Sequence, residues 1–105
     1  MTDKVLVLTT AGREAEAQNI ANQLVERRLA ACVNIVSRIQ SVYRWEGKVE
    51  TAEEFLLIIK TTKARSVDVK AAIRVLHSYE LPECIVISME DGSAEYLRWI
   101  EESVG

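Results

Sequence analysis

The chain has 105 residues, of which 49% are hydrophobic and 28% charged, and its formal net charge is −3. This is enough material for one domain, residues 1–105, with a modest core. Without a surplus of Lys and Arg, composition argues against electrostatic binding to nucleic acid or to anionic membranes. No apolar run approaches the ~20 residues of a membrane span, and no signal-peptide core opens the chain. With only two cysteines, we expect reduced thiols and a cytoplasmic protein.

A short apolar run opens the predicted fold. The segment from Val5 to Thr10 is typical of a strand that is buried on both faces. Thr10 is predicted to cap the helix that follows, because threonine side chains accept hydrogen bonds from free helical N–H groups. Apolar residues then recur at helical spacing and should face a sheet. They are Ala17, Ile20, Ala21, Leu24 and Val25.

Two unusually long strands come next, from Cys32 to Trp45 and from Lys48 to Thr62. Both are rich in β-branched and aromatic residues, and the Glu46-Gly47 pair between them is typical of a two-residue hairpin loop. If Trp45 pairs with Lys48, an unbroken ladder also pairs Ile35 with Ile58. A bulge near Ser37 and Arg38 would shift that register beyond it.

The length of this hairpin predicts an arm. Strands usually have about 5–6 residues, whereas each of these could extend ~45 Å at ~3.3 Å per residue. A small domain cannot cover such a span, so the half near the turn should project with exposed edges and apolar side chains. We therefore interpret the hairpin as an oligomerisation arm. The side chains expected at its outer half are Val42, Tyr43, Trp45 and Val49.

The rest of the chain predicts a helix, a strand and a final helix. Thr62 should cap the second helix, whose buried stripe is Val69, Ala72, Ile73 and Leu76. Pro82 ends that region, because proline cannot continue a helix. The last strand is predicted from Cys84 to Met89, and Ser93 should cap a third helix.

The order of these elements is β-α-β-β-α-β followed by a helix. It predicts an α+β, ferredoxin-like fold, in which a four-stranded antiparallel sheet carries two helices on one face. The third helix and a neighbouring subunit are the candidates to cover the other face.

Several segments together resemble the CutA family, the divalent-cation tolerance proteins, over essentially the whole chain. The segments run over residues 26–35, 41–47, 60–62, 77–83 and 96–100, with Glu54 as a further match. The resemblance implies a tight homotrimer whose hairpins pack between subunits, with an architecture like that of the nitrogen-regulatory PII proteins. It also implies a role in tolerance of copper and other divalent metals.

The family's proposed copper ligands lie at three positions, a Cys at the end of the first strand and a His-His pair. In this sequence those positions hold Thr9, Leu76 and His77, so only His77 matches. His77 is therefore the candidate metal ligand, for Cu(II) or another divalent cation. The alternative for this residue, at the predicted end of the second helix, is a capping or interface role.

Other candidate residues should gather in a cleft between subunits. Glu54 offers a carboxylate to a hard cation, and Lys60, near a helix start, offers a charge to an anion. The Cys32 thiol suits a soft metal, although free cysteines are often simply buried. Aromatic side chains would line the cleft or pack at the interface. They are Tyr43, Trp45, Tyr79 and Trp99.

The sequence thus predicts a cytoplasmic homotrimer that binds copper or another divalent metal ion in response to metal. The alternative is a trimeric signalling or scaffold module of PII-like architecture, which binds a small anion or a partner protein in intersubunit clefts. No nucleophile, base and orienting residue can be assembled around the single histidine, so we do not expect an enzyme.

Overall fold

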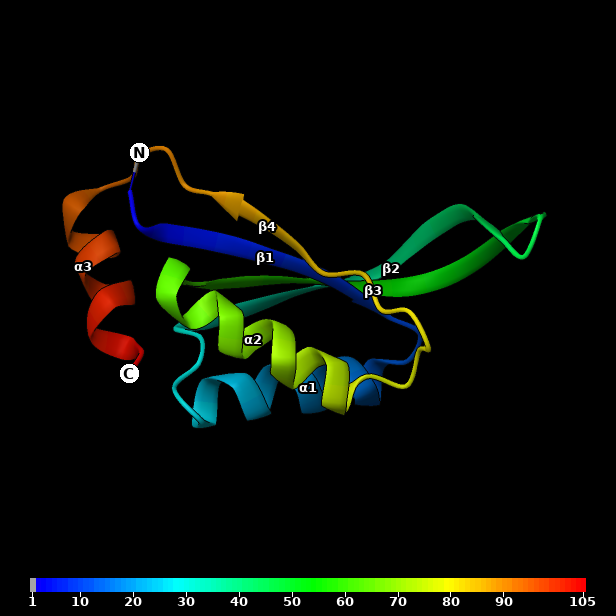
Figure 1. The fold of residues 1–105 in the computed structure, drawn as a ribbon, viewed down its shortest axis with the longest axis horizontal. Coiled ribbons are helices and arrows are strands. Elements are labelled where there is room, and N and C mark those ends of the chain that lie inside the picture. The colour runs from blue at the N-terminus through cyan, green and yellow to red at the C-terminus, as the bar shows by residue number, and fades with distance from the viewer. Residues whose placement is uncertain (1) are drawn as a thin grey trace.

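The computed structural model describes residues 2–105, and its elements follow the predicted order. They form one antiparallel sheet with strand order β2-β3-β1-β4, and the helices are arranged around it (Figure 1). The predicted ferredoxin-like α+β fold with an additional C-terminal helix is confirmed. The elements are β1 (Lys4–Ala11), α1 (Glu14–Glu26), β2 (Cys32–Trp45), β3 (Lys48–Thr62), α2 (Lys63–Leu76), β4 (Ile85–Ser88) and α3 (Ala94–Ser103).

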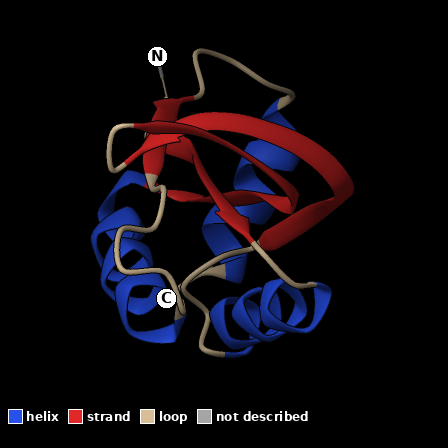
Figure 2. Cartoon of the chain, turned by 90° about the vertical axis from the view of Figure 1, so that its right-hand side faces the viewer, coloured by secondary structure: helices blue, strands red, loops and turns tan. Residues whose placement is uncertain are grey.

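The core lies between the sheet and the layer formed by α1 and α2. Because successive strand residues point to opposite faces, every second residue of β1 and β3 turns toward these helices. Figure 2 shows the twisted sheet above the helices. The side chains that meet there are fully buried, and they include Val7, Leu57 and Ile59 from the strands with Ile20, Leu24, Val69 and Ile73 from the helices.

The opposite face of the sheet is only partly covered. Ile85 and Ile87 of β4 pair with Leu8 and Leu6 of β1, and both isoleucines are more than 40% exposed. Helix α3 packs at the end of the sheet away from the arm, where its Ile100 is fully buried (Figure 1). The remainder of this face is an apolar surface open to solvent.

The hairpin of β2 and β3 extends well beyond the helices, in a molecule that measures 44 × 25 × 22 Å (Figure 1). Its turn has positive φ angles at Glu46 (50°) and Gly47 (80°), as a type I′ hairpin turn requires. Trp45 pairs with Lys48, so both strand bounds and the outer register agree with the prediction.

A bulge interrupts the ladder between Val36 and Ile39 and shifts the register by one residue. Ile35 consequently pairs with Leu57 rather than with Ile58, which corrects the unbroken ladder and agrees with the predicted bulge. Ser37 and Arg38 together lie opposite Phe55 there, and Arg38 has a φ angle of 59°. The bulge also reverses which residues of β2 share a face with Glu54: Val36 does so before it, and Tyr43 after it.

Helix caps follow the sequence in two cases out of three. The Thr62 hydroxyl accepts a hydrogen bond from the Arg65 N–H, and the Ser93 hydroxyl accepts one from the Tyr96 N–H. The predicted cap at Thr10 is wrong, because pairing with Leu56 keeps Thr10 inside β1. Arg13 precedes α1 instead, and its side chain makes no capping bond.

Two smaller expectations also differ. Strand β4 covers Ile85–Ser88 only, shorter than the predicted Cys84 to Met89. The helical spacing predicts Val25 on the buried stripe of α1, yet Val25 is 41% exposed. Across residues 2–105, no helix is long and apolar enough to span a membrane.

Candidate functional site

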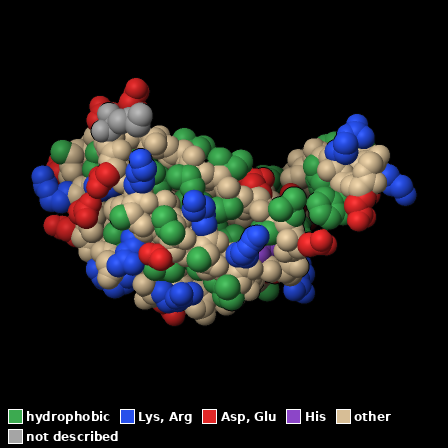
Figure 3. All heavy atoms as spheres, in the orientation of Figure 1, with side chains coloured by type: hydrophobic (Ala, Val, Ile, Leu, Met, Phe, Trp, Pro, Cys, Tyr) green, Lys and Arg blue, Asp and Glu red, His purple; other side chains and the backbone are tan. Residues whose placement is uncertain are grey.

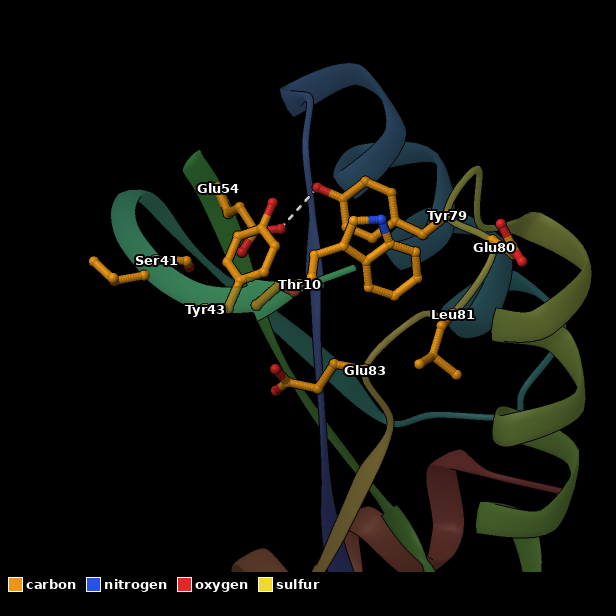
Figure 4. A pocket seen from close by; sticks show the side chains of 10 residues that line it. Thr10, Ser41, Tyr43, Glu54, Tyr79, Glu80, Leu81 and Glu83 are labelled. Atoms are coloured by element: carbon orange, nitrogen blue, oxygen red, sulfur yellow. Dashed lines mark hydrogen bonds between the residues drawn. The ribbon is translucent and has the colours of Figure 1, made fainter. Parts of the chain in front are cut away.

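A pocket lies where the arm leaves the body of the protein. Figure 3 shows the hollow that separates the arm from the rest of the surface, and Figure 4 shows the side chains around it. The cavity has a volume of about 590 Å³, within the range of small-molecule sites. Three segments supply its walls: the end of β1, the arm, and the loop before β4. The lining residues are Thr10, Ser41, Val42, Tyr43, Trp45, Glu54, Tyr79, Glu80, Leu81 and Glu83. We call this cavity the Glu54 pocket.

Glu54 is the buried acidic group of the pocket, with only 6% of its surface exposed. One carboxylate oxygen accepts a hydrogen bond of 2.7 Å from the Tyr79 hydroxyl (Figure 4). Burial, followed by the hydrogen bond to Glu54, raises the pKa of the Tyr79 hydroxyl. Tyr79 therefore stays protonated at neutral pH and acts as a donor to Glu54.

The segment that carries Tyr79 is hydrogen-bonded to three other elements. The His77 ring bonds to the Thr10 carbonyl of β1 through Nε2, at 2.5 Å. Ser78 donates through its N–H and its hydroxyl to the two carboxylate oxygens of Glu16 in α1. Tyr79 itself reaches Glu54 in β3. These bonds fix the aromatic wall of the pocket before any ligand arrives.

Gly12 gives the Tyr79 ring its space. A methyl group added at this glycine would lie 2.8 Å from the Tyr79 hydroxyl oxygen, well inside contact distance. The absence of a side chain at residue 12 thus lets the tyrosine reach the arm.

The side chains that line the pocket give it a negative charge. Glu54, Glu80 and Glu83 all line it, whereas none of the lining residues is Lys or Arg. Burial, with a second contribution from the Glu54 charge, raises the pKa of the Glu83 carboxyl. A cation in the pocket would relieve this repulsion, and an anion would add to it.

Four of the predicted cleft residues lie around this pocket: Tyr43, Trp45, Glu54 and Tyr79. The other three lie elsewhere in the chain. Cys32 pairs with Lys60 six residues further along β3, which corresponds to about 20 Å. Trp99 lies on α3, with its ring tilted against that of Tyr96 at 5.3 Å between ring centroids. A single chain therefore does not bring all seven residues to one site.

The positions of the family's copper ligands do not form a metal site here. Thr9 is fully buried, and Leu76 has no donor atom. His77 is the C-cap of α2, as predicted, but both ring nitrogens already have backbone partners. Nε2 bonds to the Thr10 carbonyl, and Nδ1 accepts from the Tyr79 N–H at 3.0 Å. Within residues 2–105, no group of three or more His, Cys, Asp or Glu side chains is placed to hold a metal.

Sequence reasoning did not single out Glu80, Leu81 and Glu83 as site residues, although all three line the pocket. A signal was available, because two carboxylates flank the Leu81-Pro82 pair in a segment that cannot be helical. Acidic residues in a rigid loop directly after a helix end are candidates for a site.

Comparisons with known proteins agree on one family. Residues 5–103 match the family described as CutA1 divalent ion tolerance protein. The chain is 44% identical to the divalent-cation tolerance protein CutA of Thermus thermophilus, covering 95% of this chain and 97% of that protein. It is 43% identical to the chloroplastic protein CutA of Arabidopsis thaliana, over 94% of this chain but only 54% of that protein.

Solved structures lead to the same family. A crystal structure of CutA from Xylella fastidiosa superimposes with a TM-score of 0.97 at 38% sequence identity. The superposition covers 99% of this chain and all of that one. Sequence and fold agree over nearly every residue, and the chain belongs to the CutA1 divalent ion tolerance protein family.

Proposed function

We propose that this chain is a non-enzymatic binding protein that acts as a homotrimer and holds a cation in the Glu54 pocket. One observation carries the proposal. Glu54 is buried, yet in the described chain no Lys, Arg or His nitrogen lies within 4.0 Å of its carboxylate. A buried carboxylate without a positive partner is costly, so a cationic ligand would be held strongly there.

The exposed arm is the observation that supports the proposed trimer. Val42 and Val49 are 67% and 65% exposed, and β2 is an edge strand along its whole length. Natural proteins seldom leave such an edge uncovered, and neighbouring copies of the arm are the simplest cover. The trimer is the assembly that the family resemblance implies. The two free cysteines suit the cytoplasm in which we place the protein.

For the family role, the cation is a divalent ion such as Cu(II). A single chain does not supply enough ligands for it, so a neighbouring subunit would provide the remaining donors. In this proposal, Glu54 is the metal ligand that each chain contributes from its own pocket. His77 stays a predicted ligand, and a metal there would have to displace one of its two backbone partners.

Calorimetric titration of Cu(II) and Zn(II) tests the proposal. Replacing Glu54 with Gln keeps the shape of the side chain and removes its charge, so affinity should fall about tenfold or more. The matched control is Glu50→Gln, which removes an exposed carboxylate four residues away on the same strand, outside the pocket. This control should bind as the native protein does.

Two results would contradict the proposal. Native and Glu54→Gln proteins with the same isotherms would remove the pocket from metal binding. Loss of binding in His77→Gln, with Glu54→Gln unaffected, would assign the metal to His77 instead. Thermal unfolding of each variant would show whether it remains folded.

Lys60 favours a second function, a scaffold that binds an anion or an acidic partner protein. Its ammonium group lies 5.6 Å from the Tyr96 ring centroid, and within residues 2–105 it makes no ion pair. Thermal shift in phosphate, compared between native protein and Lys60→Ala, tests this function. Stabilisation confined to the native form would support it, and equal shifts would contradict it.

A further inference from the structure

The pocket contains a carboxylate, that of Glu54, which forms no salt bridge within the described residues. One oxygen of Glu54 accepts from Tyr79, and the other makes no hydrogen bond within the described residues. This second oxygen is therefore a free acceptor, on a residue that is itself only 6% exposed. An N–H donor with a positive charge is the group that completes a salt bridge with it, since charge-assisted hydrogen bonds are the strong ones.

The walls of the pocket also suit an organic cation. Tyr43, Trp45 and Tyr79 present aromatic side chains to the cavity, and Val42 and Leu81 present aliphatic ones. Aromatic faces attract ammonium groups, most strongly where water is excluded. A hydrated metal ion gains little from apolar walls.

Size and the spread of the carboxylates lead to the same ligand class. A cavity of about 590 Å³ is far larger than one ion needs. The acidic side chains surround the opening instead of converging, with Glu54 beside Tyr43 on one side and Glu83 apart from them (Figure 4). None of the acidic groups in residues 2–105 forms a cluster that could hold a metal.

We infer that the Glu54 pocket binds a small organic molecule that carries a primary ammonium group on an apolar or aromatic framework. The ammonium group donates to the free oxygen of Glu54, and the framework packs on the aromatic wall and Leu81. This inference rests on the proposed cation-binding function and adds a second class of cation for the same pocket.

Phenethylammonium is the probe that tests the inference, because it combines the ammonium group with an aromatic framework. Two molecules of similar size serve as controls: 2-phenylethanol, which is neutral, and 3-phenylpropionate, which is an anion. Calorimetry with the full-length protein should show binding of phenethylammonium, with both controls weaker by tenfold or more. Equal affinity for phenethylammonium and 2-phenylethanol would overturn the inference.

Variants locate the binding. Glu54→Gln should weaken phenethylammonium about tenfold and leave 2-phenylethanol unchanged, because only the charged partner is lost. Glu50→Gln should have no effect. Trp45→Leu, which removes part of the aromatic wall of the pocket, should weaken the ammonium ligand. Unchanged affinity in both pocket variants would place the ligand elsewhere and overturn the inference.

The metal titrations separate this inference from the function on which it rests. Cu(II) binding that depends on Glu54, without any binding of phenethylammonium, would overturn the inference and leave the proposed function standing. If the native protein bound neither Cu(II) nor phenethylammonium, both the inference and the proposed function would be overturned.

Discussion

Thr9 occupies a position where the family resemblance implies a metal-binding cysteine, and its hydroxyl lies in the core. It is the buried side-chain oxygen that lacks a hydrogen-bond partner in the described chain. Desolvating a hydroxyl without such a bond costs free energy. Thr9 thus carries an unpaired hydroxyl in an apolar layer, where its side chain is closed to solvent.

Thr9→Val should raise the free energy of unfolding by about 1 kcal/mol, because it removes the unpaired hydroxyl and keeps the branched shape. Urea denaturation measures the change. Thr61→Val is the matched control: Thr61 is equally buried, but its hydroxyl donates to the Leu29 carbonyl at 2.6 Å. This variant should lose about 1 kcal/mol. A loss of stability in Thr9→Val would contradict the reasoning.

Glu83 makes the stability of the protein depend on pH. Its pKa in the folded protein is raised, so the folded state disfavours the ionised form compared with the unfolded state. The contribution of this group is fully present below the ordinary Glu pKa of about 4.3 and is lost as the pH rises through the folded pKa. Glu83→Gln should therefore be more stable than the native protein at pH 7, and the difference should disappear at low pH. Urea denaturation at pH 7 and at pH 4 measures this difference, and a constant difference would contradict the assignment.

At the scale of elements, the bulge in β2 builds the pocket. Strand residues alternate between faces, and one extra residue reverses the alternation. Arg38 lies in this bulge with a positive φ, and the bulge places Tyr43 on the face that carries Glu54. The positive φ of Arg38 is unfavourable for a residue with a side chain, so the surrounding ladder must maintain it.

Arg38 allows a direct test of the bulge geometry. Arg38→Gly should be at least about as stable as the native protein, because glycine adopts positive φ without steric cost. Arg38→Val should be less stable than Arg38→Gly by about 1–2 kcal/mol, since β-branched residues strongly disfavour this conformation. Denaturant unfolding compares the two variants. Equal stabilities would show that the bulge does not persist in solution.

The sequence was sufficient for the elements and insufficient for the pocket. Local signals determine the strand bounds at Trp45 and Lys48 and the caps at Thr62 and Ser93, and these predictions are confirmed. The cap at Thr10 failed because pairing with β3, a distant segment, extended the strand. Local propensity does not include such tertiary contacts.

The pocket depends on contacts between residues that are far apart in the chain. Glu54 and Tyr79 are separated by 25 positions, and Thr10 and His77 by 67. The residue types were therefore recognisable, but which of them meet was not. Lys60 and Trp99 show this, because they belong to the same predicted cleft and lie outside the Glu54 pocket.

At the scale of the whole molecule, the arm and the body have different kinds of stability. The body has a closed core between sheet and helices, whereas the outer arm has two strands and exposed apolar side chains. An isolated two-stranded hairpin is at best marginally stable in water. The arm accordingly needs a partner, which in the proposed trimer is a neighbouring subunit.

Shortening the arm tests the proposed assembly. Replacing residues 41–52 with a two-residue turn would join Gln40 to Glu53, which already face each other across the hairpin. We expect monomers or aggregates, because the interface is lost while the core remains. Light scattering after size-exclusion chromatography measures the mass. A soluble trimer of the shortened chain would contradict the role of the arm.

The bulge has a further consequence for the arm, which concerns the number of residues rather than their types. Without the bulge, the alternation of side chains in β2 before it would continue to the turn. Tyr43 and Trp45 would then lie on the face of Val33 and Ile35, away from Glu54. Substitutions along β2 alter one side chain at a time, but a single insertion or deletion between the bulge and the turn would exchange the two faces of the arm. The part of β2 between the bulge and the turn should therefore tolerate changes of residue identity far better than changes of length.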